Sequence, residues 1–356
     1  MRFEAIDGLR ALAALIVAFG HAYRTGILGN ALDPILHTPL AIFIAGDAAV
    51  LLFFVMSGFF IALPYAKGKS KGYFDFLSKR FFRIYIPYIA AVFAAVIAFE
   101  LFARPSGIPQ MSAWFNVLWQ TPPTIEMVLA HVLMLGEFDA NIYDPVLWAM
   151  VIEIRVAFIA PFLVLFVARF GAFAGISISL IISYCAFWAS IHFGLSEIAT
   201  AHWRTLTLLP PFLIGMSLAY HREEVLLWVK NLNSIAAFFI LMLAISLMPC
   251  AYWLGVGIAT FAHYTILSFS AAIIVIFAMN NGLFYKIISI KPLQFIGKIS
   301  YTFYLWHFII LLSLIYALFG TIANEYIFII WVLMTVPVSW LAYKLIEEPS
   351  SKLKLK

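Results

Sequence analysis

The chain has 356 residues, of which 65% are hydrophobic and only 11% are charged, and its mean hydropathy is +1.02. Soluble proteins carry roughly 25% charged residues. A water-soluble protein is therefore excluded, and lipid is expected to surround most of the chain. The net charge of +5 does not indicate nucleic-acid binding, because the basic residues lie in short loops between apolar runs.

Ten apolar runs follow one another, separated by charged or Pro- and Gly-rich breaks. They cover residues 9–26, 41–63, 84–103, 145–168, 171–192, 205–220, 234–250, 258–279, 295–318 and 325–346. Each is interpreted as a helix, because a helix satisfies its own backbone polar groups in lipid. The sequence therefore predicts an all-α, polytopic membrane protein with about ten transmembrane helices. Residues 1–356 are expected to form a single membrane-embedded domain with no appended soluble domain.

The distribution of Lys and Arg predicts the orientation of these helices. With a cytoplasmic N-terminus, 18 of the 22 Lys and Arg residues fall in cytoplasmic segments, and only Arg24, Arg104 and Arg204 fall in outside loops. This asymmetry follows the positive-inside rule and places both termini in the cytoplasm. The longest outside segment, 104–144, is expected to hold a short interfacial helix near residues 124–136.

The first apolar run carries ionisable residues, although a charge at mid-membrane costs roughly 2.5–3.5 kcal/mol. Arg10 and His21 are eleven residues apart, close to three full turns, so both project from one helix face about 16 Å apart. Asp7 lies about one turn before Arg10 and is expected to pair with it. This pattern favours a retained first helix over a cleaved signal peptide.

Three ionisable residues from different helices are expected at one depth. His21 and His307 each lie roughly 18 Å from the cytoplasmic start of their helices. Glu153 lies roughly 12 Å below the outer start of the fourth helix. In a hydrocarbon core about 30 Å thick these depths coincide. The sequence therefore predicts that the three side chains meet in one layer and mark a functional site.

A basic cluster precedes the third apolar run at Lys79, Arg80 and Arg83. Two interpretations are open. The cluster anchors the helix on the cytoplasmic side, or the two arginines bind a phosphate or diphosphate, since guanidinium groups bind phosphate oxygens bidentately. Arg155 follows Glu153 by two residues, a spacing that turns the two side chains away from each other, so no direct pair is expected.

Six segments in order resemble the acyltransferase-3 family of membrane O-acyltransferases. They are residues 6–14 followed by His21, 53–59, 80–88, 147–153, 297–307 and 347–349. Each is weak alone, but six in this order along the whole chain are not expected by chance. The chain departs from the family pattern at Ala149, where Ser is common, and at Ile154 and Arg155.

The resemblance implies an acyl-CoA-dependent O-acyltransferase of the bacterial inner (cytoplasmic) membrane. The acyl group, most often acetyl, would pass from cytoplasmic acyl-CoA to a hydroxyl of a cell-surface carbohydrate or glycolipid. Acyl-CoA is then a co-substrate, and no bound cofactor is expected. The implied partners are the lipid bilayer, acyl-CoA and the acceptor, with no nucleic acid; the oligomeric state is open. Many family members carry an extracytoplasmic hydrolase-like domain after the last helix, whereas this chain ends soon after Glu347 and is expected to act alone.

The residues and the resemblance together assign the donor side of the site. Arg80 and Arg83 are expected to bind the CoA phosphates at the cytoplasmic face. Arg10 is expected to orient the donor or its pantetheine arm. Asp7 would hold Arg10 in place through a salt bridge.

The acceptor side is assigned to the predicted ionisable layer. His21 acts as the general base on the sugar hydroxyl or briefly carries the acyl group, and both routes are open. Glu153 is expected to orient His21 or to stabilise its protonated form. Tyr301, Tyr304 and His307 are expected to line the cavity and to donate to the developing oxyanion.

Ser57 is expected in the substrate cavity but not as a nucleophile, because no Gly-x-Ser-x-Gly elbow surrounds it. Its neighbour Gly58 predicts close helix packing. The two cysteines, Cys185 and Cys250, predict neither a disulfide framework nor a metal site, and no metal is expected.

Two alternatives remain at this point. A glycolipid or solute transporter or flippase would also suit ten helices with coplanar charges. An acyltransferase that moves succinyl or a longer acyl chain is the second. CoA binding would separate the first alternative from an enzyme, because a flippase has no need to bind CoA.

Overall fold

The computed structural model describes residues 4–69, 72–104, 106–134, 136–253, 260–280 and 282–353. These residues form helices and no strand, which confirms the all-α prediction. The start of the eighth predicted run, residues 258 and 259, lies outside the described ranges. The helices are α1 (Glu4–Thr25), α2 (Asp33–Leu36), η1 (Pro39–Ile44), α3 (Gly46–Ala66), α4 (Tyr73–Phe102), η2 (Phe115–Val117), α5 (Ile125–Leu133), η3 (Ala140–Ile142), α6 (Leu147–His192), α7 (His202–Thr207), α8 (Leu209–Tyr220), α9 (Arg222–Asn231), α10 (Ser234–Leu247), α11 (Cys250–Trp253), α12 (Phe261–Met279), α13 (Leu283–Ile288), α14 (Lys291–Lys298), α15 (Ser300–Leu318), α16 (Asn324–Ala342), η4 (Tyr343–Glu347) and α17 (Glu348–Ser350).

Seven helical segments among the described residues are long and apolar enough to cross a membrane. They are α1, α3, α4, α6, α12, α15 and the continuous segment Asn324–Ser350. The predicted runs 205–220 and 234–250 correspond to shorter helices, namely α7 with α8, and α10. The number ten and the cytoplasmic placement of both termini stay predictions.

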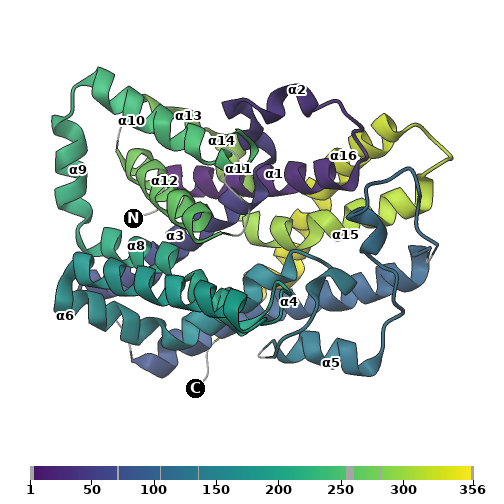
Figure 1. Ribbon diagram of the computed structural model, residues 1–356, viewed down its shortest axis with the longest axis horizontal. Helices are drawn as coiled ribbons and strands as arrows, with labels where there is room; N and C mark the ends of the chain where they lie inside the picture. Colours follow the sequence, from purple (N-terminus) through teal and green to yellow (C-terminus); the bar gives the residue numbers. More distant parts are fainter. Residues whose placement is uncertain are drawn as a thin grey trace.

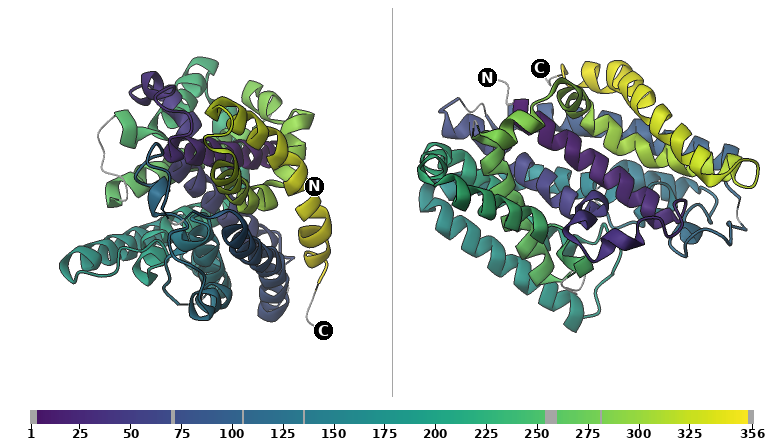
Figure 2. Two further views of the ribbon diagram at one scale, coloured as in Figure 1. Left: turned by 90° about the vertical axis from the view of Figure 1, so that its right-hand side faces the viewer. Right: turned by 90° about the horizontal axis from the view of Figure 1, so that it is seen from above.

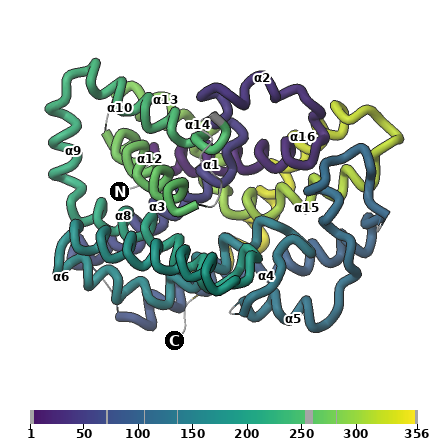
Figure 3. The backbone as a smooth tube through the Cα atoms, viewed as in Figure 1, coloured from purple at the N-terminus to yellow at the C-terminus, as the bar shows by residue number. Residues whose placement is uncertain are grey.

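Helix α6 contains two of the predicted runs. Its backbone leaves the helical region at Gly171, where φ is 85° and ψ is 169°. Glycine adopts this positive φ without the steric cost of a Cβ. The chain turns back there, as the tube in Figure 3 shows beside the α6 label. The break predicted between residues 168 and 171 is confirmed, and the two halves of α6 lie along the outside of the bundle (Figure 2).

Helix α1 runs through the middle of the molecule (Figure 1). It packs against α3, α14 and α15, and Figure 2 shows neighbouring helices on both sides of it. Close approach at its start depends on glycine, because a Cβ at Gly297 would overlap the backbone carbonyl of Asp7. This central position gives one helix access to both ends of the bundle.

Helices α3 and α8 also approach each other through small residues. A Cβ on Gly58 would overlap the carbonyl oxygen of Phe212, and one on Gly215 would overlap that of Val55. Nearly every residue of α8 is buried as a result. The close packing predicted at Gly58 is confirmed.

Replacing Gly58 with alanine is expected to lower the free energy of unfolding by about 1–3 kcal/mol or more, because the added methyl group meets rigid backbone. Thermal unfolding of the purified protein in detergent measures the effect. Gly46→Ala is the matched control on the same helix, since its nearest neighbour, the Cα of Val17, would lie 3.8 Å from the new Cβ. Equal melting temperatures for the two variants would contradict the packing argument.

The loop before α6 lies inside the protein. Tyr143, Val146 and Leu147 have no exposed surface. The indole of Trp119 donates to the carbonyl of Tyr143 over 2.7 Å, and the hydroxyl of Tyr304 donates to the carbonyl of Val146 over 3.0 Å. Helix α6 therefore begins among buried residues inside the bundle.

Candidate active site

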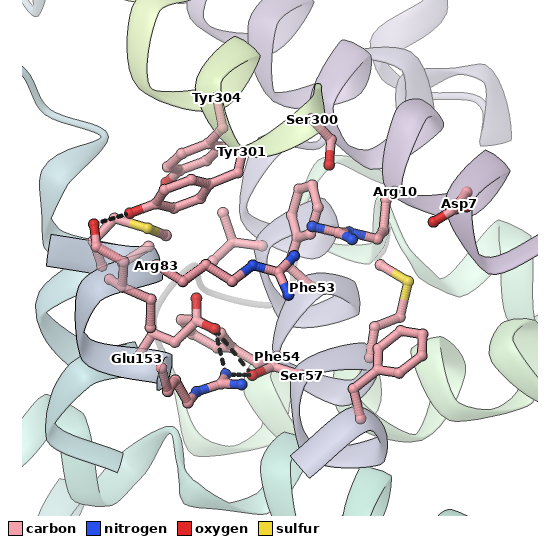
Figure 4. Close-up of a pocket in the computed structure, with 17 residues that line it drawn as sticks. Asp7, Arg10, Phe53, Phe54, Ser57, Arg83, Glu153, Ser300, Tyr301 and Tyr304 are labelled. Carbon is pink, nitrogen blue, oxygen red and sulfur yellow. Dashed lines mark hydrogen bonds and ion pairs between the residues drawn. The ribbon is translucent and has the colours of Figure 1, made fainter. Parts of the chain in front are cut away.

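A chamber of about 470 Å³ lies between α1, α3, α4, α6 and α15. Eight of the ten predicted site residues line it, namely Asp7, Arg10, Ser57, Arg80, Arg83, Glu153, Tyr301 and Tyr304. We call it the inner chamber. Figure 4 shows the guanidinium group of Arg83 pointing into it between Arg10 and Glu153. The remaining wall is mostly apolar, with Phe53 and Phe54 on one side.

An ion pair crosses the inner chamber from α4 to α6. Nη2 of Arg80 lies 2.5 Å from Oε1 of Glu153, and the two side chains are only 17% and 19% exposed. Oγ of Ser57 donates to the same carboxylate oxygen over 3.1 Å and accepts a hydrogen bond from Arg80. Charge-assisted bonds of this kind are about twice as strong as neutral ones. The triad fixes three helices around the chamber.

Two histidines meet beyond the inner chamber. Nδ1 of His21 lies 2.9 Å from Nε2 of His307. Nδ1 of His307 lies 2.8 Å from the carbonyl oxygen of Tyr304. Because a carbonyl only accepts, this nitrogen of His307 carries a proton. In the neutral pair, Nε2 of His307 then accepts from Nδ1 of His21, and Nε2 of His21 keeps a free lone pair for a base.

Aromatic rings surround the His21 imidazole. It stacks on Trp114 with 5.8 Å between the ring centroids and lies 4.9 Å from the Phe308 ring. The guanidinium of Arg24 covers Trp114 at 4.2 Å from the ring centroid. His21 keeps part of its surface exposed. It thus lies toward the C-terminal end of α1, whereas Asp7 and Arg10 lie at the start.

The predicted layer of three ionisable groups is correct for the histidines and wrong for Glu153. His21 and His307 are in contact, but Glu153 bonds to Arg80 and Ser57 instead. The predicted depth of Glu153 assumes that α6 starts at a membrane surface, whereas its first residue, Leu147, is buried inside the bundle. The hydrogen-bond partner of His21 is His307, not Glu153.

The hydroxyl groups of Tyr301 and Tyr304 donate hydrogen bonds to backbone carbonyls. Tyr301 donates to the carbonyl of Ile84 over 2.6 Å, and Tyr304 donates to that of Val146 over 3.0 Å. Both residues line the inner chamber as predicted. With these donors engaged, they form its wall, and neither points a free donor at an oxyanion.

Arg155 does not pair with Glu153, as its spacing predicted. Its guanidinium donates to the carbonyls of Thr200 and Gly136 over 2.8 and 2.7 Å, and to Oγ1 of Thr205 over 3.1 Å. The side chain thereby joins the loops on either side of α6. The short helix predicted near residues 124–136 is α5, which begins after Thr124.

A second chamber, of about 650 Å³, adjoins the first. We call it the basic chamber. Its lining is Asp7, Arg10, Lys79, Arg83, Lys298, Tyr343, Glu347, Ser351 and Lys352. Asp7, Arg10 and Arg83 belong to both chambers and form the neck between them. Since Asp7 and Lys352 lie near the two ends of the described chain, both ends lie beside this chamber.

A buried carboxyl lies on the loop that precedes α6. Asp144 has no exposed surface, and its Oδ1 accepts from the backbone N–H of Val146 over 3.2 Å. Burial raises the pKa of this carboxyl well above its ordinary value. The folded protein therefore holds the proton more tightly than the unfolded chain does.

Asp144→Asn is expected to melt at a higher temperature than the wild type, by a margin that widens as the pH rises from about 4. Below that pH, Asp144 is protonated in both states and the raised pKa costs no stability. Above it, the unfolded wild-type chain gains stability by ionising, whereas asparagine cannot ionise and keeps the bond to Val146. Thermal unfolding in detergent between pH 4 and about pH 8 tests this.

Glu137→Gln is a comparison in which the pH dependence of stability should have the opposite sign. The backbone N–H of His202 lowers the pKa of Glu137, so its stabilising effect is present at neutral pH and lost on acidification. A pH-independent difference between Asp144→Asn and wild type would contradict the assignment of Asp144 as a buried neutral acid.

Comparison of the sequence with known proteins identifies its family. The family model described as "Acyltransferase domain" (Acyl_transf_3) matches residues 3–344. The chain belongs to the acyltransferase-3 family. Both chambers and the histidine pair lie within the matched region, except for Glu347, Ser351 and Lys352 at the end of the basic chamber.

Named relatives in the acyltransferase-3 family come from several bacteria. O-acetyltransferase OatA of Staphylococcus aureus (strain NCTC 8325 / PS 47) is 26% identical over 375 residues, covering 98% of this chain and 57% of the relative. Peptidoglycan O-acetyltransferase OatA of Listeria monocytogenes is 24% identical, with 98% and 55% covered. Nodulation protein 10 of Rhizobium leguminosarum bv. viciae is 25% identical, with 98% and 93% covered. The chain thus spans little more than half of the two OatA proteins. No solved structure matches it significantly.

Several residues at the site did not emerge from the sequence. The positive-inside rule alone explains Lys298 and Lys352 in the sequence, and nothing in the sequence pattern distinguishes Tyr343. Trp114 lies in a loop far from His21 in the sequence, so only the fold brings the two rings together. An apolar loop residue gives no sign that it will contact a buried histidine.

Proposed function

We propose that this acyltransferase-3 protein moves an acyl group, most often acetyl, from acyl-CoA to a hydroxyl of a cell-surface carbohydrate or glycolipid. One observation carries the proposal. Helix α1 has Arg10 at the neck of two chambers and, about 16 Å further along, His21 bonded to His307. The relatives named O-acetyltransferase and peptidoglycan O-acetyltransferase support acetyl as the group and an envelope glycan as the acceptor.

The donor enters from the basic chamber. Arg10 and Arg83 at the neck bind the diphosphate, since two guanidinium groups match its oxygens. The thioester arm extends through the inner chamber toward the histidines. Arg80, which was expected to bind phosphate, instead pairs with Glu153 and Ser57 and shapes the wall around the arm.

The histidine pair carries the proton during transfer. Nε2 of His21 takes the proton of the acceptor hydroxyl as its oxygen attacks the thioester carbonyl carbon. The new C–O bond forms, the C–S bond breaks, and the departing CoA sulfur receives the proton from His21. Nδ1 of His21 donates to His307 throughout, which stabilises the imidazolium that forms between the two steps. In the route through an acyl-histidine, the same lone pair attacks the thioester carbonyl first, and CoA leaves as the thiolate. The acceptor hydroxyl then attacks the acyl-imidazole, the C–N bond breaks, and the hydroxyl proton passes to the CoA thiolate.

The two substrates reach the site from opposite ends of α1. By the positive-inside rule, the basic chamber beside the chain ends faces the cytoplasm, where acyl-CoA is made. His21, Trp114 and Arg24 then face the outer side, where the acceptor lies. A bacterial inner membrane is the expected location.

The test combines CoA binding with transfer. Membranes that contain the protein are incubated with radiolabelled acetyl-CoA, and label in envelope glycans is compared with that from membranes lacking it. Label that depends on the protein, together with CoA binding by the purified chain, supports the proposal. Absence of both favours the glycolipid or solute transporter. CoA binding without acetyl transfer points to succinyl-CoA or longer acyl-CoA donors.

A further inference from the structure

The basic chamber holds more positive charge than a diphosphate requires. Five cationic residues line it, namely Arg10, Lys79, Arg83, Lys298 and Lys352, against the two carboxylates of Asp7 and Glu347. The proposed mechanism uses only the two arginines at the neck. The three lysines remain without an assigned role.

The three lysines have only weak or exposed pairings. Nζ of Lys352 lies 3.8 Å from Glu348, with the lysine side chain 73% exposed. Nζ of Lys298 lies 5.3 Å from the centroid of the Tyr343 ring. Lys79 is bonded to Asp75 over 2.6 Å at the partly exposed start of α4. Exposed ion pairs of this kind contribute little to stability, so folding does not account for this concentration of lysines.

An irregular turn forms the far wall. The segment Tyr343–Glu347 is π-helical, a rare form that is frequent at functional sites. It places an aromatic ring and a buried carboxylate on the same chamber, and Thr302 donates to Glu347 over 3.1 Å. Tyr343 thereby adds an aromatic surface to a cavity otherwise lined by charged residues and Ser351.

We propose that the basic chamber binds the 3′-phosphorylated adenosine end of the CoA donor, with Lys298 and Lys352 binding the 3′-phosphate. This inference rests on the proposed function. The volume of about 650 Å³ lies within the range of small-molecule sites. The neck continues from it into the inner chamber, so a ligand with its nucleotide among the lysines would place its thioester arm where the mechanism needs it. Lysine suits a phosphate monoester as a compact point charge.

The experiment measures dissociation constants of the full-length purified chain for CoA and for 3′-dephospho-CoA. We expect the wild type to bind CoA about tenfold more tightly, the size of one charge-assisted contact. In the double variant Lys298→Ala with Lys352→Ala, the ratio of the two constants should fall to about one, because only CoA loses a contact. Lys291→Ala on the same helix as Lys298 is the matched control, since Lys291 does not line the chamber, and it should keep the wild-type ratio.

Each outcome bears on a different claim. The lysine assignment would be overturned if the wild type bound the two ligands equally well, or if the double variant kept the wild-type ratio. In either case, CoA binding by the wild type would still support the proposed enzyme. Adenosine 3′,5′-bisphosphate, which lacks the thioester arm, is the third probe. If it binds in a lysine-dependent way but transfer is absent from acetyl-CoA, succinyl-CoA and longer acyl-CoA donors alike, the nucleotide site stands and the enzyme proposal falls.

Discussion

Replacing His21 with alanine is expected to lower acetyl transfer by roughly 10²–10⁴-fold, the usual contribution of a general base. Nε2 of His21 is the nitrogen that the hydrogen bonds of the pair leave unprotonated. The variant should keep its affinity for CoA, because the neck at Arg10 and Arg83 is untouched. The measurement is transfer of radiolabel from acetyl-CoA to envelope glycans at matched expression.

Variants of His307 provide the control for this prediction. His307→Gln leaves an acceptor that Nδ1 of His21 can reach, whereas His307→Leu removes it. Activity should therefore decrease from wild type to His307→Gln to His307→Leu. The pH dependence of transfer should shift in His307→Leu, where the imidazolium of His21 loses its partner. Equal labelling by His21→Ala and wild type would reduce His21 to a packing residue and reject the mechanism.

Removing the carboxylate of Glu153 is expected to destabilise the protein by about 3–5 kcal/mol, because the guanidinium of Arg80 would remain largely buried without its partner. Glu153→Ala should therefore unfold at a much lower temperature in detergent than the wild type. The double variant Glu153→Ala with Arg80→Met removes both charges and should recover part of this loss.

Ser57→Ala completes the test of the triad. It removes one hydrogen bond to each charged partner but leaves the ion pair, so its effect should be about 1.5–3 kcal/mol at most. If the effects of Glu153→Ala and Arg80→Met were simply additive, the two side chains would not be coupled, and the triad would not be the structural centre of the chamber.

The helices were predictable because lipid and protein interior impose the same apolar requirement on a helix. For that reason the sequence could not separate α8, which is covered by protein on nearly all sides, from a helix that spans the membrane. The same ambiguity caused the error at Glu153. Hydropathy marks where an apolar run begins, but it does not reveal that α6, which starts at Leu147, begins inside the bundle.

The contact between His21 and His307 was predictable from depth because both helices start at the same end of the bundle. The eight predicted residues that line the inner chamber belong to motifs that lie far apart in the sequence. The basic chamber was missed because a lysine near a helix end has an ordinary explanation in membrane topology. The rings of Trp114 and Tyr343 could not be placed either, since neither depth nor periodicity applies to them.

The residues between the inner chamber and the histidine pair bear on whether the protein leaks protons across the membrane. Tyr304 lines the inner chamber, and its carbonyl accepts a hydrogen bond from Nδ1 of His307, so a single residue contacts both the chamber and the histidine pair. In the proposed mechanism a thioester enters from one side and a hydroxyl from the other, and such a passage would leak ions unless it stayed closed between turnovers. The rings of Tyr304, Phe308 and Trp114 lie around the histidine pair, and we expect them to close this passage. Replacing Tyr304 with alanine should open the passage, so vesicles reconstituted with Tyr304→Ala should be more permeable to protons than vesicles with the wild type.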